Sequence, residues 1–235
     1  MQCIILTAGK GTRLRPLTDA TPKPLVKVAG KPLIDHIVES LPSSIEELII
    51  VTGYLEEQIR EYCGKEFHGR PVTYMHQEVQ DGTARALWLC KDLLRGRFLF
   101  MYGDDIHGAN DIARLTSYNR SMLAKTVPNP ERFGIVVRNP DGTVATIEEK
   151  PEHPPSNLAS TGGFVLDMNL FKFEPQKPVN GEYYLPEVVE RYSKEYPVAV
   201  VEEAVWIPIG YPEDIEKAEK ILAARSTINL EQATL

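Results

Sequence analysis

The sequence has few cysteines, no excess of basic residues and no long apolar run, and each shortage argues against a class of protein. Its three cysteines (Cys3, Cys63 and Cys90) are an odd number, lie far apart and form no C-x-x-C pair, so neither a disulfide framework nor a zinc site is expected. The formal net charge of -7 makes nucleic acid an unexpected partner. No apolar run of about 18 residues and no signal-peptide pattern occur, which predicts a cytoplasmic protein with no membrane partner.

What is present is ordinary for a globular protein. The chain has 235 residues, of which 43% are hydrophobic and 25% charged, enough for one domain with a sizeable core. An anionic substrate would have to be met by local cations inside a generally acidic molecule. The sequence shows no internal repeat and leaves open whether the chain forms a homo-oligomer.

The first 25 residues hold the densest signal. A short apolar run at residues 2–6 leads directly into TAGKGTR at residues 7–13, and PKPL follows at residues 22–25. Glycine lets the backbone turn its N–H groups toward anionic oxygens, and Arg13 and Lys23 add charge that a phosphate could use. The motif is not GxxxxGK[ST], and Leu14 stands where the third glycine of GxGxxG would be. Taken alone, these glycines would equally suit a solvated turn.

Hydrophobic patterning predicts an α/β fold. Apolar strand patterns alternate with helical ones, which predicts a mostly parallel sheet covered by helices on both faces. Such sheets bind ligands outside the carboxyl ends of their strands, where the glycine loop and Asp104 should both lie. Strands are expected at residues 2–6, 47–54, 72–76 and 98–102, and helices at residues 32–41, 55–63 and 83–94.

The pattern changes after residue 110. A helix is expected at residues 111–119, followed by strands at 133–138, 144–149 and 164–167 that are separated by turn residues. This pattern of strands separated by turns predicts an antiparallel insertion packed against the first part of the chain. Two further helices are expected at residues 184–192 and 212–224, and residues 226–235 form a tail without a strong pattern.

The string LTAGKGTRLRPLT, followed by PKPLVKVAGKPLIDH, closely resembles the signature of the sugar-1-phosphate nucleotidylyltransferases. That family includes glucose-1-phosphate thymidylyltransferases and the uridylyltransferase half of the N-acetylglucosamine-1-phosphate enzymes. The resemblance implies a Rossmann-like nucleotide-diphospho-sugar transferase fold, with one domain at residues 1–225. Within it, a nucleotide core would occupy mainly residues 1–110 and a sugar-site insertion about residues 130–205.

The implied reaction joins a nucleoside triphosphate to a sugar-1-phosphate and releases pyrophosphate, by Mg²⁺-dependent in-line attack on the α-phosphorus. The attacking phosphate oxygen is already anionic, so positioning and fixed positive charge matter more than a general base. No reactive serine, cysteine or histidine is therefore needed.

The resemblance assigns roles on the nucleotide side. Arg13 matches the arginine that holds the triphosphate and the leaving pyrophosphate, and Lys23 matches the lysine at the reacting phosphates. Asp104 matches the magnesium ligand, since Mg²⁺ binds through one or two carboxylates plus phosphates and water. Gln77 stands five residues before Gly82, as in relatives that read thymine or uracil, which favours dTTP or UTP. The expected nucleotide contacts are Ala8, Gly9, Gly11, Thr12, Gln77, Gly82 and Thr83.

Three further segments match sugar-site motifs of the family in the right order. Gly134 would leave room for the sugar ring, Glu149 would accept hydrogen bonds from its hydroxyls, and Lys150 would contact its phosphate. Ser160 occupies a position that varies with the sugar.

One departure from the family pattern concerns the metal. Relatives read W-x-D-[IV]-G-x-P near the C-terminus and use that aspartate as a second magnesium ligand, whereas this chain has Pro208 there. Either Asp104 holds Mg²⁺ with phosphates and water alone, or Asp105 or Glu202 compensates, or catalysis is impaired. The alternatives to an active enzyme of this kind are a weak homologue that binds nucleotide or nucleotide sugar for regulation, and a cytidylyltransferase for a non-sugar phosphoester such as phosphocholine.

Overall fold

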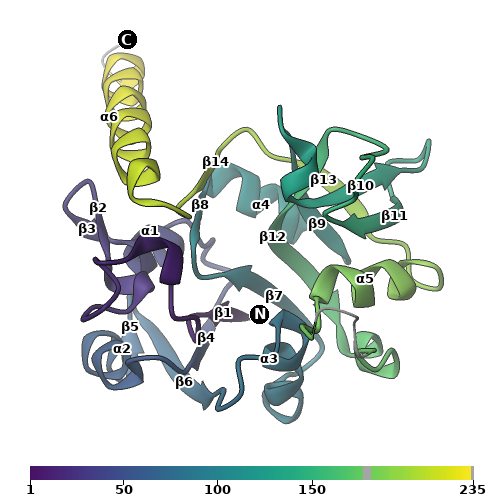
Figure 1. Ribbon diagram of the computed structural model, residues 1–235, viewed down its shortest axis with the longest axis horizontal. Coiled ribbons are helices and arrows are strands. Elements are labelled where there is room, and N and C mark those ends of the chain that lie inside the picture. Colours follow the sequence, from purple (N-terminus) through teal and green to yellow (C-terminus); the bar gives the residue numbers. More distant parts are fainter. Residues whose placement is uncertain (177–180, 234–235) are drawn as a thin grey trace.

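A computed structural model describes residues 1–176 and 181–233, with side chains up to residue 225. Its centre is a set of parallel strands in the order β7 (Arg97–Tyr102), β1 (Gln2–Leu6), β4 (Glu47–Thr52) and β6 (Arg70–His76). These are the four strands expected in the first part of the chain. The prediction of a mostly parallel sheet there is confirmed (Figure 1).

The second part of the chain extends this sheet with antiparallel strands. β12 (Leu158–Asp167) pairs edge to edge with β7, and Phe164 lies opposite Phe100. Beyond β12 lie β10 (Gly134–Arg138) and β11 (Val144–Glu149). β9 (Ser121–Thr126) also pairs with β12, and β13 (Ala199–Glu202) pairs with β9 in parallel. The sequence predicted an insertion packed against the core, but these strands instead continue the same sheet.

The helices follow the expected positions with two differences. They are α1 (Leu33–Glu39), α2 (Glu56–Cys63), α3 (Thr83–Leu89), α4 (Ala109–Ser117), α5 (Leu185–Ser193) and α6 (Pro212–Ala233). The helix expected to reach residue 94 ends at Leu89 and is followed by a 3-10 turn, Lys91–Leu93. Helix α6 runs through most of the tail for which no structure was expected, and Figure 1 shows it projecting from the body.

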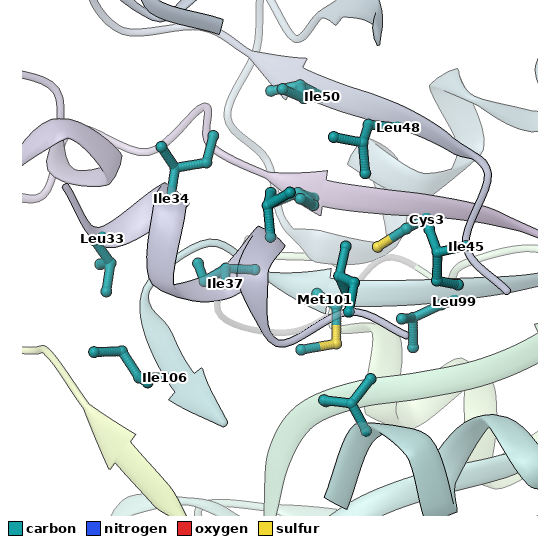
Figure 2. Packing of buried hydrophobic residues seen from close by; sticks show 14 of the residues in the cluster. Cys3, Leu33, Ile34, Ile37, Ile45, Leu48, Ile50, Leu99, Met101 and Ile106 are labelled. Atoms are coloured by element: carbon teal, nitrogen blue, oxygen red, sulfur yellow. The ribbon is translucent and has the colours of Figure 1, made fainter. Parts of the chain in front are cut away.

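Alternate residues of the central strands pack on opposite faces of the sheet. Figure 2 shows Ile37 of α1 close to Met101 of β7, and Leu33 and Ile34 of the same helix belong to the same buried cluster as Cys3 of β1. On the other face, residues such as Ile4 and Phe100 belong to a second cluster with α3 and α5. Burial on both faces explains why these strands are continuous apolar runs in the sequence.

The three cysteines are all buried and form no disulfide. Burial raises the pKa of the Cys63 and Cys90 thiols to about 12, so both are protonated at neutral pH and poor nucleophiles.

Three short strand pairs complete the structure. β2 (Lys27–Val28) pairs with β3 (Lys31–Pro32), and β5 (Glu66–Phe67) lies on the edge of the sheet beside β6. β8 (Asp105–His107) pairs with β14 (Trp206–Pro208), which brings residues 206–208 next to the strand end at Asp104. No helix in the described part of the chain is long and apolar enough to cross a membrane.

Candidate active site

A pocket of about 830 Å³ opens at the carboxyl ends of the parallel strands. Leu6 at the end of β1 pairs with Tyr102 at the end of β7, so the loops that follow these two strands start side by side. The site residues predicted from the sequence come from several separate segments, and all of them line this pocket: Ala8, Gly9, Gly11, Thr12, Arg13, Lys23, Gln77, Gly82, Thr83, Asp104, Gly134, Glu149, Lys150 and Ser160. The fold therefore brings the two halves of the motif set to one place.

The glycine loop after β1 offers backbone N–H groups to the pocket, whereas its Ala8 carbonyl is already hydrogen-bonded within the protein. The Ala8 carbonyl accepts hydrogen bonds from the Tyr54 N–H at 3.1 Å and from Gln80 Nε2 at 2.7 Å. Within the described residues, the backbone N–H groups of residues 9–11 donate to no protein acceptor. Backbone donors left without partners beside a pocket are suited to anionic oxygens.

Lys23 and Asp104 form an ion pair inside the pocket. Lys23 Nζ lies 2.9 Å from Asp104 Oδ2, and the lysine side chain is only 11% exposed whereas that of the aspartate is 38% exposed. The lysine is buried because the 3-10 turn that carries it, Lys23–Leu25, packs against α1. The pair therefore fixes a cation and a carboxylate next to one another at the strand end.

The carboxylate of Asp105 is turned toward β14. It is 8% exposed and accepts a hydrogen bond from Trp206 Nε1 at 2.9 Å. Burial, together with the adjacent negative charge of Asp104, raises the pKa of Asp105 above its usual range. Pro208 lies opposite Asp105 in the β8–β14 ladder, and the Ile209 N–H donates to the Asp104 carbonyl at 3.1 Å. Pro208, which stands where the family pattern expects a second carboxylate, thus lies beside the Asp104 backbone.

The carboxylates of the pocket fit a magnesium ion whose other ligands are phosphate oxygens and water. The described residues contain no group of three or more acidic, histidine or cysteine side chains that could hold a metal alone. Asp104 uses Oδ2 for Lys23, and Asp105 is engaged by Trp206. Glu202, the other candidate for compensation, is absent from the pocket lining, and its carboxylate instead accepts from Thr126. One carboxylate with phosphates and water is a usual environment for Mg²⁺.

The segment at the start of α3 is held by the loop before α5. Gln77 is buried and donates from Nε2 to the Gly82 carbonyl at 3.3 Å. Gly82 has a φ of +123°, and a Cβ there would lie 2.4 Å from the backbone of Tyr183, so only glycine fits. The Thr83 hydroxyl does not cap α3 but accepts the Leu185 N–H at 2.9 Å. Two loops far apart in the sequence thereby form one wall.

The antiparallel strands form the opposite wall. Gly134 at the start of β10 lies opposite Glu149 at the end of β11, and a Cβ at Gly134 would be 2.9 Å from Glu149 Oε2. Burial raises the pKa of the Glu149 carboxyl, although the Lys150 charge opposes this rise. Lys150 has a positive φ of 46°, an unusual conformation for a side chain of its size, and its Nζ lies 3.6 Å from Glu149 Oε1.

The Ser160 hydroxyl is buried, lines this wall and has no hydrogen-bond partner among the described residues; the same holds for Thr161. Both hydroxyls lie where β12 breaks register with β9, between Ser160 and Phe164. A buried polar atom without a partner in a pocket indicates a place for a ligand's polar group.

Several lining residues were not predicted from the sequence. No role was assigned to them from the sequence, although Gln80 and Tyr211 stand inside motif segments: Gln80, Tyr102, Arg132, Glu182, Tyr184, Tyr211, Glu213 and Lys217. Only the tertiary arrangement brings them to the pocket, because most lie in loops or at the start of α6.

Comparison with known proteins gives a consistent picture. A family model described as Nucleotidyl transferase matches residues 2–225. The UTP--glucose-1-phosphate uridylyltransferase AglF of Haloferax volcanii is 37% identical, over 97% of this chain and 98% of that protein. The bifunctional protein GlmU of Methanocaldococcus jannaschii is 34% identical over 94% of this chain, which spans 54% of its length.

Solved structures share the fold. A Bacillus anthracis protein described as a glucose-1-phosphate thymidylyltransferase superposes with a TM-score of 0.83 at 29% identity, covering 94% of both chains. A UDP-glucose pyrophosphorylase complexed with UDP-glucose gives the same TM-score at 21% identity, over 95% of this chain and 98% of that one, which is evidence for the fold only.

Proposed function

The chain belongs to the nucleotidyl transferase family, and from this premise we propose that it is a sugar-1-phosphate nucleotidylyltransferase that uses UTP or dTTP and a hexose-1-phosphate such as glucose-1-phosphate. The observation that carries the proposal is that every predicted site residue, from both halves of the sheet, lines one pocket. Two polyanionic reactants have to bind next to one another in one pocket in order to react.

The reaction is a substitution at phosphorus. An oxygen of the sugar phosphate forms a bond to the α-phosphorus, and the bond from the α-phosphorus to the oxygen that bridges to the β-phosphorus breaks. The bonding electrons leave with pyrophosphate, and because the attacking phosphate oxygen is already anionic, no proton has to be removed from it at neutral pH. Catalysis then depends on positioning and on charges that stabilise the leaving group.

On the nucleotide side, the N–H groups of residues 9–12 bind phosphate oxygens and Arg13 binds the outer phosphates. Lys23 holds the reacting phosphates from its buried position beside Asp104. The Gln77 amide offers a donor and an acceptor to the edge of uracil or thymine, and Gly82 lets the base approach the backbone.

On the sugar side, Gly134 and Ser160 leave room for the ring, and Glu149 accepts hydrogen bonds from its hydroxyls. Lys150 binds the sugar phosphate. This division makes residues 1–110 the nucleotide core and about 130–205 the sugar side of a single catalytic unit.

Asp104 is the protein ligand that we propose for Mg²⁺, because it is the carboxylate at the strand end that is exposed to the pocket. When bound with the nucleotide, Mg²⁺ neutralises part of the negative charge of the phosphates. The neighbouring ammonium of Lys23 keeps the carboxylate oriented toward them.

The direct experiment is to mix the protein with one triphosphate, one sugar-1-phosphate and Mg²⁺ and to measure pyrophosphate released and nucleotide sugar formed. UTP, dTTP, CTP, ATP and GTP are each paired with glucose-1-phosphate and N-acetylglucosamine-1-phosphate. We expect release that requires both substrates and Mg²⁺ and is fastest with UTP or dTTP. No release above background with any pair would contradict the proposal, and a CTP-only profile would favour the cytidylyltransferase alternative.

Pro208 is the one observation that favours a binding protein with little turnover. Calorimetric titration with UTP and with UDP-glucose separates the two functions. A protein that binds both ligands tightly but releases no pyrophosphate would be a regulator rather than an enzyme.

A further inference from the structure

Two guanidinium groups lie against one aromatic ring at the pocket. Arg13 Cζ is 5.3 Å and Arg132 Cζ is 6.0 Å from the centroid of the Tyr211 ring. Arg13 follows the glycine loop, Arg132 ends the 3-10 turn Pro130–Arg132 before β10, and Tyr211 directly precedes α6. Three segments that are distant in the sequence thus meet at this ring, and all three residues line the pocket.

The remaining cations of the pocket already have carboxylate partners. The lysines pair with acidic side chains at distances between 2.9 and 3.6 Å: Lys23 with Asp104, Lys150 with Glu149, and Lys217 with Asp214. In the part of the chain that the structure describes, neither Arg13 nor Arg132 has a carboxylate within 4.0 Å. Their charges are therefore not neutralised by the protein.

Two uncompensated positive charges at one ring indicate an anionic ligand. Contact with a partly exposed aromatic ring stabilises a cation only weakly, and the two guanidinium groups repel one another. An anion with several oxygens relieves this repulsion, and the planar guanidinium fork matches phosphate oxygens in pairs. In the proposed reaction the group that gains negative charge is pyrophosphate.

We propose that Arg132 binds the leaving pyrophosphate together with Arg13, and that Tyr211 is a positioning residue that holds the two guanidinium groups apart. This inference rests on the proposed function and adds a residue from the sugar side to the binding of the nucleotide's outer phosphates. The connection is short, since the neighbouring Phe133 carbonyl accepts the Lys150 N–H at 3.0 Å. Arg132 therefore lies next to the wall that is proposed to hold the sugar phosphate.

The test uses inorganic pyrophosphate with Mg²⁺ as the probe, titrated into the full chain by calorimetry. Arg132→Ala is expected to weaken pyrophosphate binding by about 10-fold, because it removes a charged hydrogen-bond donor pair. In the reverse reaction with UDP-glucose, the KM of the Arg132→Ala variant for pyrophosphate should rise by a similar factor. The KM for glucose-1-phosphate in the forward direction stays within about twofold of the wild-type value.

Matched variants separate the site from general charge and from folding. Arg138→Ala removes an arginine from the same strand region, but this side chain pairs with Glu202 outside the pocket, so pyrophosphate binding should not change. Tyr211→Phe keeps the ring and should bind as the wild type does, whereas Tyr211→Leu should bind more weakly. Arg132→Lys keeps the charge without the fork and should be intermediate.

Unchanged pyrophosphate affinity in Arg132→Ala, with normal forward activity, would overturn the inference and leave the proposed function intact. A loss confined to glucose-1-phosphate would also overturn it, by assigning Arg132 to the sugar phosphate. If the wild type neither bound pyrophosphate nor released it from any substrate pair, the proposed function itself would fail.

Discussion

The two halves of the sheet build their walls of the pocket in different ways. In the parallel half, the site residues lie in loops after strand ends: Arg13 after β1, Gln77 after β6 and Asp104 after β7. In the antiparallel half, Gly134, Glu149 and Ser160 lie within the strands themselves. The position of a loop side chain depends on the turn that carries it, whereas the position of a strand side chain depends on the register of strand pairing.

The register of β10 and β11 shows how much this difference matters. Gly134 opposes Glu149, so the missing side chain on one strand makes room for the carboxylate of the other. A slip by one residue would move every side chain of a strand to the other face of the sheet. We therefore expect a substitution in the nucleotide half to remove the chemical contribution of a single group. A substitution in the sugar half should change the binding of one substrate, the sugar-1-phosphate.

The largest effect is expected from Asp104→Asn in the nucleotide half. The change removes the proposed metal ligand and the partner of Lys23, so kcat for pyrophosphate release should fall by roughly 100-fold or more. The thermal unfolding midpoint should change little, because the side chain is partly exposed. Glu202→Gln is the control, an exposed carboxylate outside the pocket. A kcat within twofold of the wild-type value would remove Asp104 from the site.

A selective effect is expected from Lys150→Ala in the sugar half. Loss of a charged contact to the sugar phosphate should raise the KM for the sugar-1-phosphate by about 10-fold. The KM for UTP should remain within about twofold, which steady-state titration of each substrate measures. An equal rise in both constants would contradict the separation of the two halves.

Gly134→Ala tests the register argument directly. Its Cβ would lie 2.9 Å from Glu149 Oε2, so the carboxylate has to move. We expect the KM for the sugar-1-phosphate to rise by about 5-fold with a smaller change for UTP, since small misplacements of a binding group are costly. Gly142→Ala in the β10–β11 turn lies outside the pocket, and because Gly142 has a φ of +84° the substitution strains the backbone, so this variant controls for a general loss of stability. Normal sugar kinetics in Gly134→Ala would show that the glycine serves another purpose.

The smallest effect is expected from Pro208→Asp at the joint between the halves. The substitution places a carboxylate opposite Asp105 and beside Asp104, where relatives carry one. The Mg²⁺ concentration for half-maximal activity should fall by about 2- to 5-fold. If the requirement rose or stayed the same, Asp104 would be the complete protein contribution to the metal.

Much of the fold could be predicted because the parallel half has strong local signals. Buried strands are continuous apolar runs, and a glycine can mark the end of a helix, as at Gly64 after α2. The missed elements are short or irregular. β9 (SMLAKT) mixes polar and apolar residues without clear alternation, and β12 contains Gly162 and Gly163, which resemble a turn in the sequence.

The candidate site was predictable only where residues belong to a dense motif. Arg13, Asp104 and Glu149 stand in strings whose order carries information. Arg132 received no role from such a string, and the motif around Tyr211 does not reveal the contact between the two residues, because that contact depends on where α6 starts relative to the 3-10 turn before β10. Pairing of that kind is a property of tertiary structure, and no local pattern encodes it.

The central claim is that two walls of different construction bring two different reactants to one pocket. Amide NMR shifts of the labelled protein, titrated first with UTP and Mg²⁺ and then with glucose-1-phosphate, test it most directly. UTP should shift Gly11 and Gly82, and glucose-1-phosphate should then shift Gly134 and Ser160. Shifts of one common set by both ligands, or of residues outside the pocket, would contradict the account.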